Sequence, residues 1–109
     1  MSKHRLDVLE RLADTVVDRA AAAPKSSYTA RLLSQGTEKC AKKLGEEAVE
    51  TALAAMTTDR DHVAAEAADL LYHLLVLLQS VGVPLSAVMV KLDERMGRGG
   101  LSEKAARQF

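Results

Sequence analysis

Apolar residues recur at helical spacing along most of the chain, and turn-forming residues divide the pattern into segments. The first predicted helix runs from about residue 5 to 22 and ends before Pro24. A short helix over 28–34 follows, and longer helices are predicted over 37–56, 60–81 and 86–96. Ser102 is suited to cap a last short helix. Because no strand pattern, repeat or linker interrupts these helices, the sequence predicts a single all-α domain over residues 1–109.

The predicted helix over 37–56 has one apolar and one charged side, and Thr37 is suited to be its N-cap. We expect the apolar stripe to face the core, with the charged residues on the opposite side. The stripe consists of Ala41, Leu44, Ala48, Ala52, Leu53 and Met56, and the charged side carries Lys39, Lys43, Glu46, Glu47 and Glu50.

The helix over 60–81 is unusual because its middle is apolar almost all the way round. From residue 64 to 78 the only exceptions are Glu66, Asp69, Tyr72 and His73. Such a helix is normally buried, and a buried carboxylate costs several kcal/mol unless it is paired or bound to a metal. Neither acid has a lysine or arginine three or four residues away. His73 lies one turn after Asp69, and we interpret it as a hydrogen-bonded core residue.

Four acids form two pairs, Glu47 with Glu50 and Glu66 with Asp69, each spaced so that both members share a helix face. Two antiparallel helices with a short connector would bring all four carboxylates together. Oxygen ligands of this kind suit Mg²⁺, which usually keeps waters and substrate phosphates as its other ligands. The pattern therefore favours phosphate chemistry. Two alternatives stay open: a solvated face with a Lys43–Glu47 ion pair, and pairing of the second acids with cations from other helices.

Charge and cysteine content narrow the class of protein. Fifteen basic and fifteen acidic side chains give a formal net charge of zero, which does not favour a nucleic-acid or membrane partner. Cys40 is the only cysteine, so an internal disulfide is excluded and a reducing compartment is favoured. The start of the chain shows no secretory signal, and the apolar run over 64–78 is too short and too acidic to span a bilayer. We therefore expect a cytoplasmic protein.

The acidic pattern resembles the signature of the MazG-like all-α nucleoside-triphosphate pyrophosphohydrolases. That signature is EExxE followed by ExxD, and here it reads Glu46-Glu47-x-x-Glu50 and Glu66-x-x-Asp69. Further segments narrow the resemblance to the phosphoribosyl-ATP pyrophosphatases of histidine biosynthesis, from Leu6 onward. These segments are Ser27-Tyr28-Thr29, Leu32-Leu33, Gly36, Lys39, Lys43-Leu44-Gly45-Glu46-Glu47 and Asp69-Leu70-Leu71-Tyr72-His73.

This resemblance implies Mg²⁺-dependent hydrolysis of 1-(5-phosphoribosyl)-ATP to 1-(5-phosphoribosyl)-AMP and pyrophosphate, the second step of histidine biosynthesis. It also implies a homodimer with a helical bundle across the interface, so that dimerisation completes the core, and a possible functional link to the cyclohydrolase of the next step. Carried over by motif, Glu47, Glu50, Glu66 and Asp69 are the expected metal ligands. Glu46 and Glu47 are the catalytic candidates, with Glu46 as a helper or candidate base.

Three further groups are candidate substrate contacts. Lys39 and Lys43 share the face of the first acidic pair and are suited to phosphates, although helix salt bridges are an equal alternative. Ser27, Tyr28 and Thr29 precede a helix and suit an anion, or serve simply as a cap. Arg95 and Arg98 flank a glycine-rich turn that resembles the family's tail, except that Gly99 replaces a frequent serine. The alternative for that turn is a flexible tail.

Two other functions stay open. One is a house-cleaning enzyme that hydrolyses free or damaged nucleoside triphosphates with the same acidic site. The other is a non-enzymatic helical scaffold, which leaves Glu66 and Asp69 without a reason to lie on an apolar helix.

Overall fold

A computed structural model describes residues 6–97 of the 109-residue chain. Within that part the chain forms five helices and no strand, which confirms the all-α class. The helices are α1 (Asp7–Ala20), α2 (Tyr28–Ser34), α3 (Thr37–Ala54), α4 (Arg60–Ser80) and α5 (Leu85–Met96). The short helix was predicted with its exact bounds, and the ends predicted for the other four helices lie within two residues of the observed ends, which is ordinary fraying. The helix expected after Ser102 lies outside the described residues.

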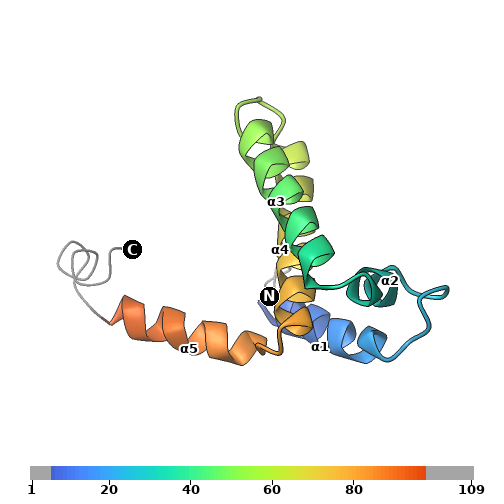
Figure 1. The fold of residues 1–109 in the computed structure, drawn as a ribbon. Helices are drawn as coiled ribbons and strands as arrows, with labels where there is room; N and C mark the ends of the chain where they lie inside the picture. The colour runs from blue at the N-terminus through green and yellow to red at the C-terminus, as the bar shows by residue number, and fades with distance from the viewer. Residues whose placement is uncertain (1–5, 98–109) are drawn as a thin grey trace.

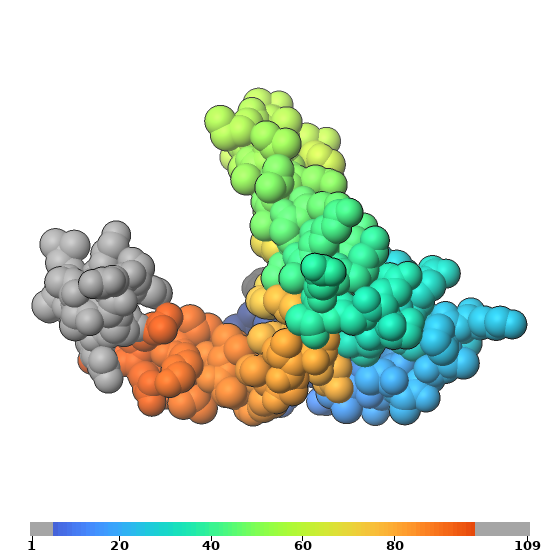
Figure 2. Space-filling view, in the orientation of Figure 1, coloured from blue at the N-terminus to red at the C-terminus, as the bar shows by residue number. Residues whose placement is uncertain are grey.

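Helices α3 and α4 form a long antiparallel hairpin, and this hairpin is the centre of the fold (Figure 1). Helices α1 and α2 pack at the end of the hairpin where α3 begins and α4 finishes. Helix α5 extends away from the other four, and the space-filling view shows it as an arm beside the body (Figure 2). No residue of α5 is buried.

The connections between helices show which capping predictions hold. Asp59 is the N-cap of α4, and its side chain accepts a hydrogen bond from the His62 backbone N–H at 3.1 Å. The prediction that Thr37 caps α3 is wrong. Gly36 is the N-cap, and its φ of 93° lies in the left-handed region that glycine favours. Thr37 is therefore already helical, and its hydroxyl instead donates to Ser80 Oγ at 3.1 Å.

The core is small and lies where α1, α2, α3 and α4 meet. It consists of Val16, Leu32, Cys40, Leu75 and Val76, all at most 5% exposed. The Cys40 thiol donates to the Leu32 carbonyl oxygen, and burial raises the pKa of this thiol. The body of the molecule is therefore held together at one end of the hairpin, while the other end stands free of α1 and α2.

The predicted orientation of α3 is wrong within this single chain. Of the expected core stripe, Leu53 is 63% and Met56 is 83% exposed, the three alanines are exposed, and only Leu44 is half-buried. The side that contacts α4 carries Thr51 and Ala54 instead, together with Glu47. Small side chains allow the two helices to approach closely, so the acidic side of α3 faces its neighbour and the apolar stripe faces outward.

Helix α4 also differs from the expectation of a fully buried helix. Only His73, Leu75 and Val76 are buried, all in its second half, and Leu71 is 43% exposed. By length and composition alone α4 is long and apolar enough to cross a membrane. Two carboxylates of this helix belong to the acidic group described below, which is unfavourable in a lipid environment.

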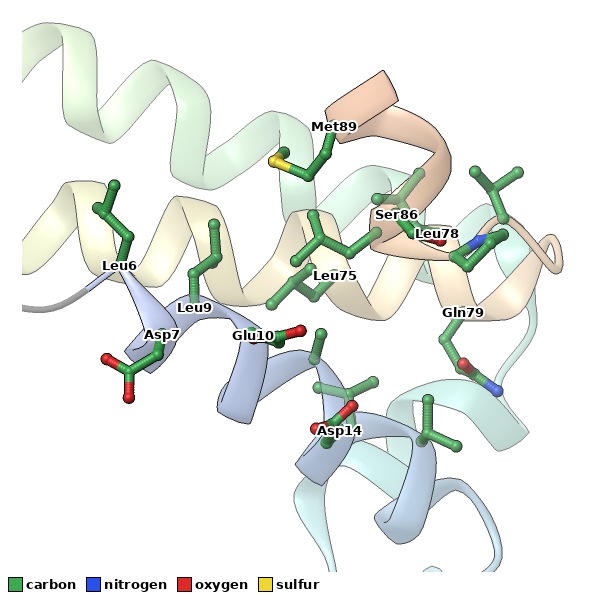
Figure 3. Close-up of a pocket in the computed structure, with 16 residues that line it drawn as sticks. Leu6, Asp7, Leu9, Glu10, Asp14, Leu75, Leu78, Gln79, Ser86 and Met89 are labelled. Atoms are coloured by element: carbon green, nitrogen blue, oxygen red, sulfur yellow. The ribbon is translucent and has the colours of Figure 1, made fainter. Parts of the chain in front are cut away.

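A cavity of about 660 Å³ lies between α1, the second half of α4 and the beginning of α5 (Figure 3). Leu9, Leu75, Leu78 and Met89 point into it from these three helices. The wall is mainly apolar, with Glu10 and Asp14 of α1 at its side. The charged side chains that line the cavity are all acidic, so it is not suited to bind a phosphorylated substrate.

Candidate active site

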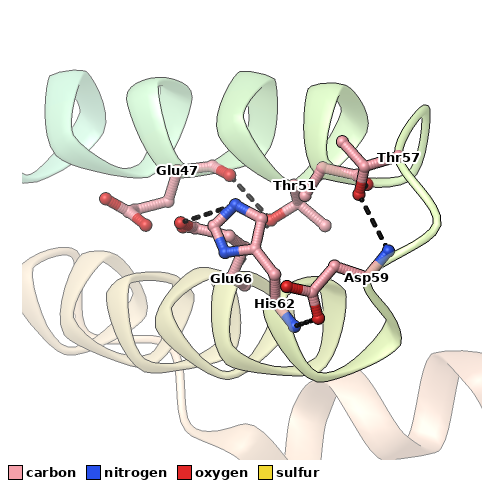
Figure 4. Close-up of polar contacts among 7 residues, drawn as sticks. Glu47, Thr51, Thr57, Asp59, His62 and Glu66 are labelled. Atoms are coloured by element: carbon pink, nitrogen blue, oxygen red, sulfur yellow. Dashed lines mark hydrogen bonds and ion pairs between the residues drawn. The ribbon is translucent and has the colours of Figure 1, made fainter.

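Three carboxylates meet between α3 and α4. Glu47 of α3 and Glu66 and Asp69 of α4 each offer an oxygen, and these oxygens all lie within 4.8 Å of one another. Figure 4 shows Glu47 reaching down from one helix towards Glu66 on the other. Glu47 and Glu66 are half-buried and Asp69 is exposed, so the group opens to solvent on one side. The structure thus brings together three of the four predicted metal ligands.

Thr51 joins the two helices next to this group. Its Oγ1 lies 2.8 Å from the Glu47 carbonyl oxygen and 3.0 Å from the Glu66 carbonyl oxygen, so one hydroxyl hydrogen is shared between two acceptors. The first contact is the usual bond of a helical threonine to the preceding turn. The second fixes the register of α4 against α3 (Figure 4). This role is not visible in the sequence, because threonine has no charge and forms such bonds in many helices.

The electrostatics of the group are unfavourable without a cation. Burial raises the pKa of the Glu47 carboxyl, and the negative charges of Glu50, Asp69 and Glu66 raise this pKa further. Glu47 Oε1 and Glu66 Oε1 are buried and have no hydrogen-bond partner among the described residues. Buried polar atoms are almost always satisfied, and orphaned carboxylate oxygens that converge are the ligands expected for a hard divalent cation. The donor set therefore fits Mg²⁺.

Glu50 and His62 lie at the edge of the acidic group. Glu50 is exposed and is not part of the three-oxygen cluster, but it lines a hollow of about 260 Å³ with His62 and Glu66. His62 Nε2 lies 3.8 Å from Glu66 Oε2 (Figure 4). His62 was not predicted from the sequence, although its place four residues before Glu66 on the same helix was a usable signal.

Lys43 pairs with Glu46 at 3.4 Å, which leaves Glu47 for the acidic group. The alternative of a Lys43–Glu47 ion pair on a solvated face is therefore wrong within the described residues. The hydrogen bond with Glu46 also raises the pKa of the Lys43 ammonium, as does the nearby Tyr28. Lys39 is half-buried in the first turn of α3. Glu46 is thus held beside a cation rather than among the three carboxylates.

The segment from Ser27 to Thr29 has structural partners for both of its aliphatic hydroxyls. Ser27 is the N-cap of α2 and accepts a hydrogen bond from the Ala30 backbone N–H at 3.1 Å. Thr29 is buried, and its hydroxyl is hydrogen-bonded to the Tyr72 hydroxyl of α4. Tyr28 is 44% exposed and lies near Lys43. The substrate contacts of this segment stay a prediction, and Tyr28 has the most accessible side chain for one.

His73 is buried and hydrogen-bonded, as the sequence predicted. Its side chain is 7% exposed, and Nδ1 lies 2.8 Å from the Asp69 carbonyl oxygen. Tyr28 and Tyr72 contact the imidazole edge-on. The remaining site predictions concern the C-terminal arginines. Arg95 is half-buried in the last turn of α5, and Arg98 lies outside the described residues.

The described residues form an all-α fold with carboxylates that converge between two antiparallel helices, as the resemblance to the MazG-like class implies. Comparison with known proteins then identifies the family. The model of the phosphoribosyl-ATP pyrophosphohydrolase family matches residues 9–96. The chain belongs to this family, which confirms the resemblance seen in the sequence.

Curated relatives agree over nearly the whole chain. The phosphoribosyl-ATP pyrophosphatase of Agrobacterium fabrum is 55% identical over 107 residues, which covers 98% of this chain and 97% of that protein. The phosphoribosyl-ATP pyrophosphatase of Rhizorhabdus wittichii is 56% identical over 99 residues, which covers 91% of this chain and 93% of that protein. The phosphoribosyl-ATP pyrophosphatase of Cereibacter sphaeroides strain ATCC 17025 is 55% identical over 102 residues, which covers 94% of this chain and 99% of that protein.

Proposed function

We propose that this chain is a single-domain hydrolase that converts 1-(5-phosphoribosyl)-ATP into 1-(5-phosphoribosyl)-AMP and pyrophosphate, in the second step of histidine biosynthesis. The observation that carries the proposal is the group of Glu47, Glu66 and Asp69, with its two orphaned buried oxygens, in a chain of this family. Neither oxygen has a hydrogen-bond partner in the described part of the chain, so a cation that accompanies a polyphosphate is the partner their chemistry favours.

We assign Mg²⁺ to this group, with Glu47, Glu50, Glu66 and Asp69 as its ligands. When bound, Mg²⁺ supplies positive charge that neutralises phosphate oxygens and activates water. Glu50 lies outside the 4.8 Å group but lines the hollow beside Glu66, so its carboxylate is available from the exposed side. The acids on the two helices would hold this cation, whose charge would offset the repulsion between their carboxylates and the α- and β-phosphates of the substrate.

The remaining residues bind and orient the substrate and move one proton. The raised pKa of Glu47 suits a carboxylate that accepts the proton of the attacking water, and Glu46 assists from the next position. Lys39, Lys43 and Tyr28 lie on the side of α3 and α2 where phosphates would approach. Ser27 and Thr29 position this segment, and Arg95 and Arg98 are proposed to contact the phosphates from the C-terminal part.

Pyrophosphate release with Mg²⁺ tests the proposal, with phosphoribosyl-ATP compared against ATP, dUTP and dCTP at equal concentration. We expect strong preference for phosphoribosyl-ATP, and loss of activity with EDTA. Replacing Asp69 or Glu50 by the isosteric amide should lower kcat by about 100-fold or more while the helical circular-dichroism signal stays unchanged. Preference for a free nucleotide would instead indicate a house-cleaning enzyme. No release from any nucleotide by the folded chain would leave a scaffold.

We also propose that two chains form a homodimer. Four large apolar side chains are exposed in the single chain. They are Leu53 and Met56 of the apolar stripe, Leu71 of α4 and Leu92 of the arm α5. A protein of this size rarely exposes so much apolar surface unless another surface covers it. Sedimentation equilibrium should give twice the chain mass, and Leu53→Lys on the stripe should weaken the dimer. A wild-type chain that sediments as a monomer would contradict this proposal.

The pathway assignment implies two further proposals. The product of this reaction is the substrate of the cyclohydrolase that performs the next step, so we propose a functional link between the two enzymes. A coupled assay should show that the product passes from this enzyme to the cyclohydrolase faster than the separate rates of the two enzymes predict. We further propose a cytoplasmic location, which fractionation of cells expressing the tagged chain would test.

A further inference from the structure

The arm α5 has one apolar side, and the end of this side is exposed. Leu85, Met89, Leu92 and Met96 lie within about 60° of one another around the helix axis. The first two line the cavity against α1 and α4, whereas Leu92 is 46% and Met96 is 77% exposed. Arg95 follows Leu92 by three residues and lies at one edge of the apolar side. The end of the arm thus presents apolar side chains with a cation beside them.

A second exposed apolar surface lies on α3, towards the free end of the hairpin. Val49, Leu53 and Met56 are all more than half exposed, and their spacing places them on one side of the helix. These three residues are called the outer face of α3. Leu53 also lines the hollow of about 260 Å³ together with Glu50 and Glu66. The outer face of α3 is therefore continuous with the edge of the acidic group.

The arm cannot bring Arg95 to the acidic group of its own chain. Asp69 precedes the last residue of α4, Ser80, by eleven positions, which corresponds to about 16 Å of helix. Helix α5 begins beyond that end at Leu85 and carries Arg95 about 15 Å further along an axis that leads away from the hairpin (Figure 1). Within one chain, Arg95 and the acidic group are thus separated by parts of two helices that point in different directions.

The end of the arm and the outer face of α3 match each other in spacing and in charge. Each has apolar side chains one helical turn apart, so the ridges of one helix can pack into the grooves of the other. A pair of like charges four positions apart borders each surface, basic on the arm and acidic on α3. These pairs are Lys91 with Arg95, and Glu46 with Glu50. Each chain carries both surfaces, so two chains related by a two-fold axis can cover all four at once.

We propose that in the homodimer the arm α5 of each chain packs on the outer face of α3 of the other chain, and that Arg95 thereby contacts the substrate phosphates at the acidic group of that other chain. This inference rests on the proposed function and on the proposed homodimer. Leu92 and Met96 cover Leu53, and the guanidinium donates charge-assisted hydrogen bonds to phosphate oxygens. Each of the two sites is then built from both chains, and a single chain has the acids without this arginine.

A mixed dimer of two impaired chains tests whether the site is shared. One chain carries Arg95→Ala and the other Asp69→Asn, with different affinity tags, so that purification through both tags yields only mixed dimers. Pyrophosphate release from phosphoribosyl-ATP with Mg²⁺ is measured for the mixed dimer and both parent homodimers. We expect each parent to lose about 30-fold or more in kcat/KM. The mixed dimer should recover about half of the wild-type activity, because one of its two sites combines an intact Asp69 with an intact Arg95 from the other chain.

The control for this experiment is Asp93→Ala, because Asp93 is exposed on the other edge of the arm. This variant should keep kcat/KM within about threefold of the wild type. An equal loss in Asp93→Ala and Arg95→Ala would overturn the role of Arg95, as would full activity of the Arg95→Ala homodimer. A mixed dimer as inactive as its parents would overturn the sharing of the site.

Crosslinking locates the arm without any turnover, so it separates a failure of this inference from a failure of the proposed function. Leu53→Cys and Leu92→Cys are introduced together, and a short bismaleimide is added to the native protein. The Cys40 thiol is buried and does not compete for the reagent. A denaturing gel should show a covalent dimer for the double variant and a monomer for each single variant.

A covalent dimer of either single variant would overturn the inference, because the same helix of the two chains would then meet across the two-fold axis. A double variant that forms no covalent dimer would overturn it as well. A wild-type chain that releases no pyrophosphate would overturn the proposed function and the role of Arg95, whereas the position of the arm would still be decided by the crosslink.

Discussion

Glu47→Gln tests whether the acidic group is held together against electrostatic repulsion. The substitution keeps the shape of the side chain and removes one of three charges whose oxygens lie within 4.8 Å of one another. At 4.8 Å two unit charges repel by about 0.9 kcal/mol in bulk water and by about 3.5 kcal/mol at an effective dielectric constant of about 20. Because Glu47 is only half-buried and salt screens the group, the lower value applies.

Glu47 has two such neighbours, so its neutralisation should relieve roughly 1–2 kcal/mol. The metal-free variant should therefore unfold at a Tm higher by on the order of 5–10 °C. In saturating Mg²⁺ the wild type should instead have the higher Tm, because it binds the cation more tightly and is stabilised by that binding.

The assay is thermal unfolding by circular dichroism in low-salt buffer, with EDTA and then with Mg²⁺. Glu46→Gln is the matched control, because Glu46 is paired with Lys43 on the surface and its loss should change stability by less than about 0.5 kcal/mol. A metal-free Glu47→Gln variant that is no more stable than the wild type would refute the reasoning.

Three other predictions follow from contacts described above. The pKa of the Glu47 carboxyl is raised in the folded chain, so the folded state binds the carboxyl proton more tightly than the unfolded chain does. The free energy of unfolding therefore falls as pH rises from the ordinary carboxyl pKa through the raised one. Urea unfolding across this range should therefore show the advantage of Glu47→Gln growing with pH, and an advantage that shrank with pH would be inconsistent with the shift. Ser27→Ala should lower the free energy of unfolding by about 1 kcal/mol because the α2 cap is lost, whereas Ser27→Asn should retain most of that stability. Equal denaturation midpoints for the two variants would argue against capping by Ser27. Burial raises the pKa of the Cys40 thiol, so iodoacetamide at mildly alkaline pH should label this thiol only after unfolding. Rapid labelling of the native chain, seen by mass spectrometry, would contradict the burial of Cys40.

Within residues 6–97 the sequence was sufficient for the number and type of helices, because each has its own period and its own stop signal. Gly36 and Gly82 end one helix pattern each, and Asp59 begins the next. The acidic pairs were also visible, because their spacing places both members on one helix face. What spacing cannot determine is which face of α3 meets α4. That choice depends on how closely the backbones approach, and the small Thr51 and Ala54 side chains decided it in favour of the acidic face.

The residues that the sequence analysis missed share one property. Thr51 and His62 make their relevant contacts through ordinary hydrogen bonds or weak pairing, and many helices contain such residues without a functional role. Tyr72 was noted in the sequence without a partner, and its contact with Thr29 spans 43 positions in the chain. Contacts of this kind follow from the packing of α2 against α4, and one sequence does not reveal that packing.

The Thr51 hydroxyl has a consequence for how the site could change during evolution or design. A slip of one helix by a single turn moves side chains by about 5.4 Å, which is farther than the carboxylate oxygens are apart. The shared bond to the Glu47 and Glu66 carbonyl oxygens makes such a slip costly, since it leaves a half-buried hydroxyl without its second acceptor. The alignment of the acids is thus encoded by an uncharged residue, and grafting only the four acids onto another helical hairpin would transfer the ligands without their spacing.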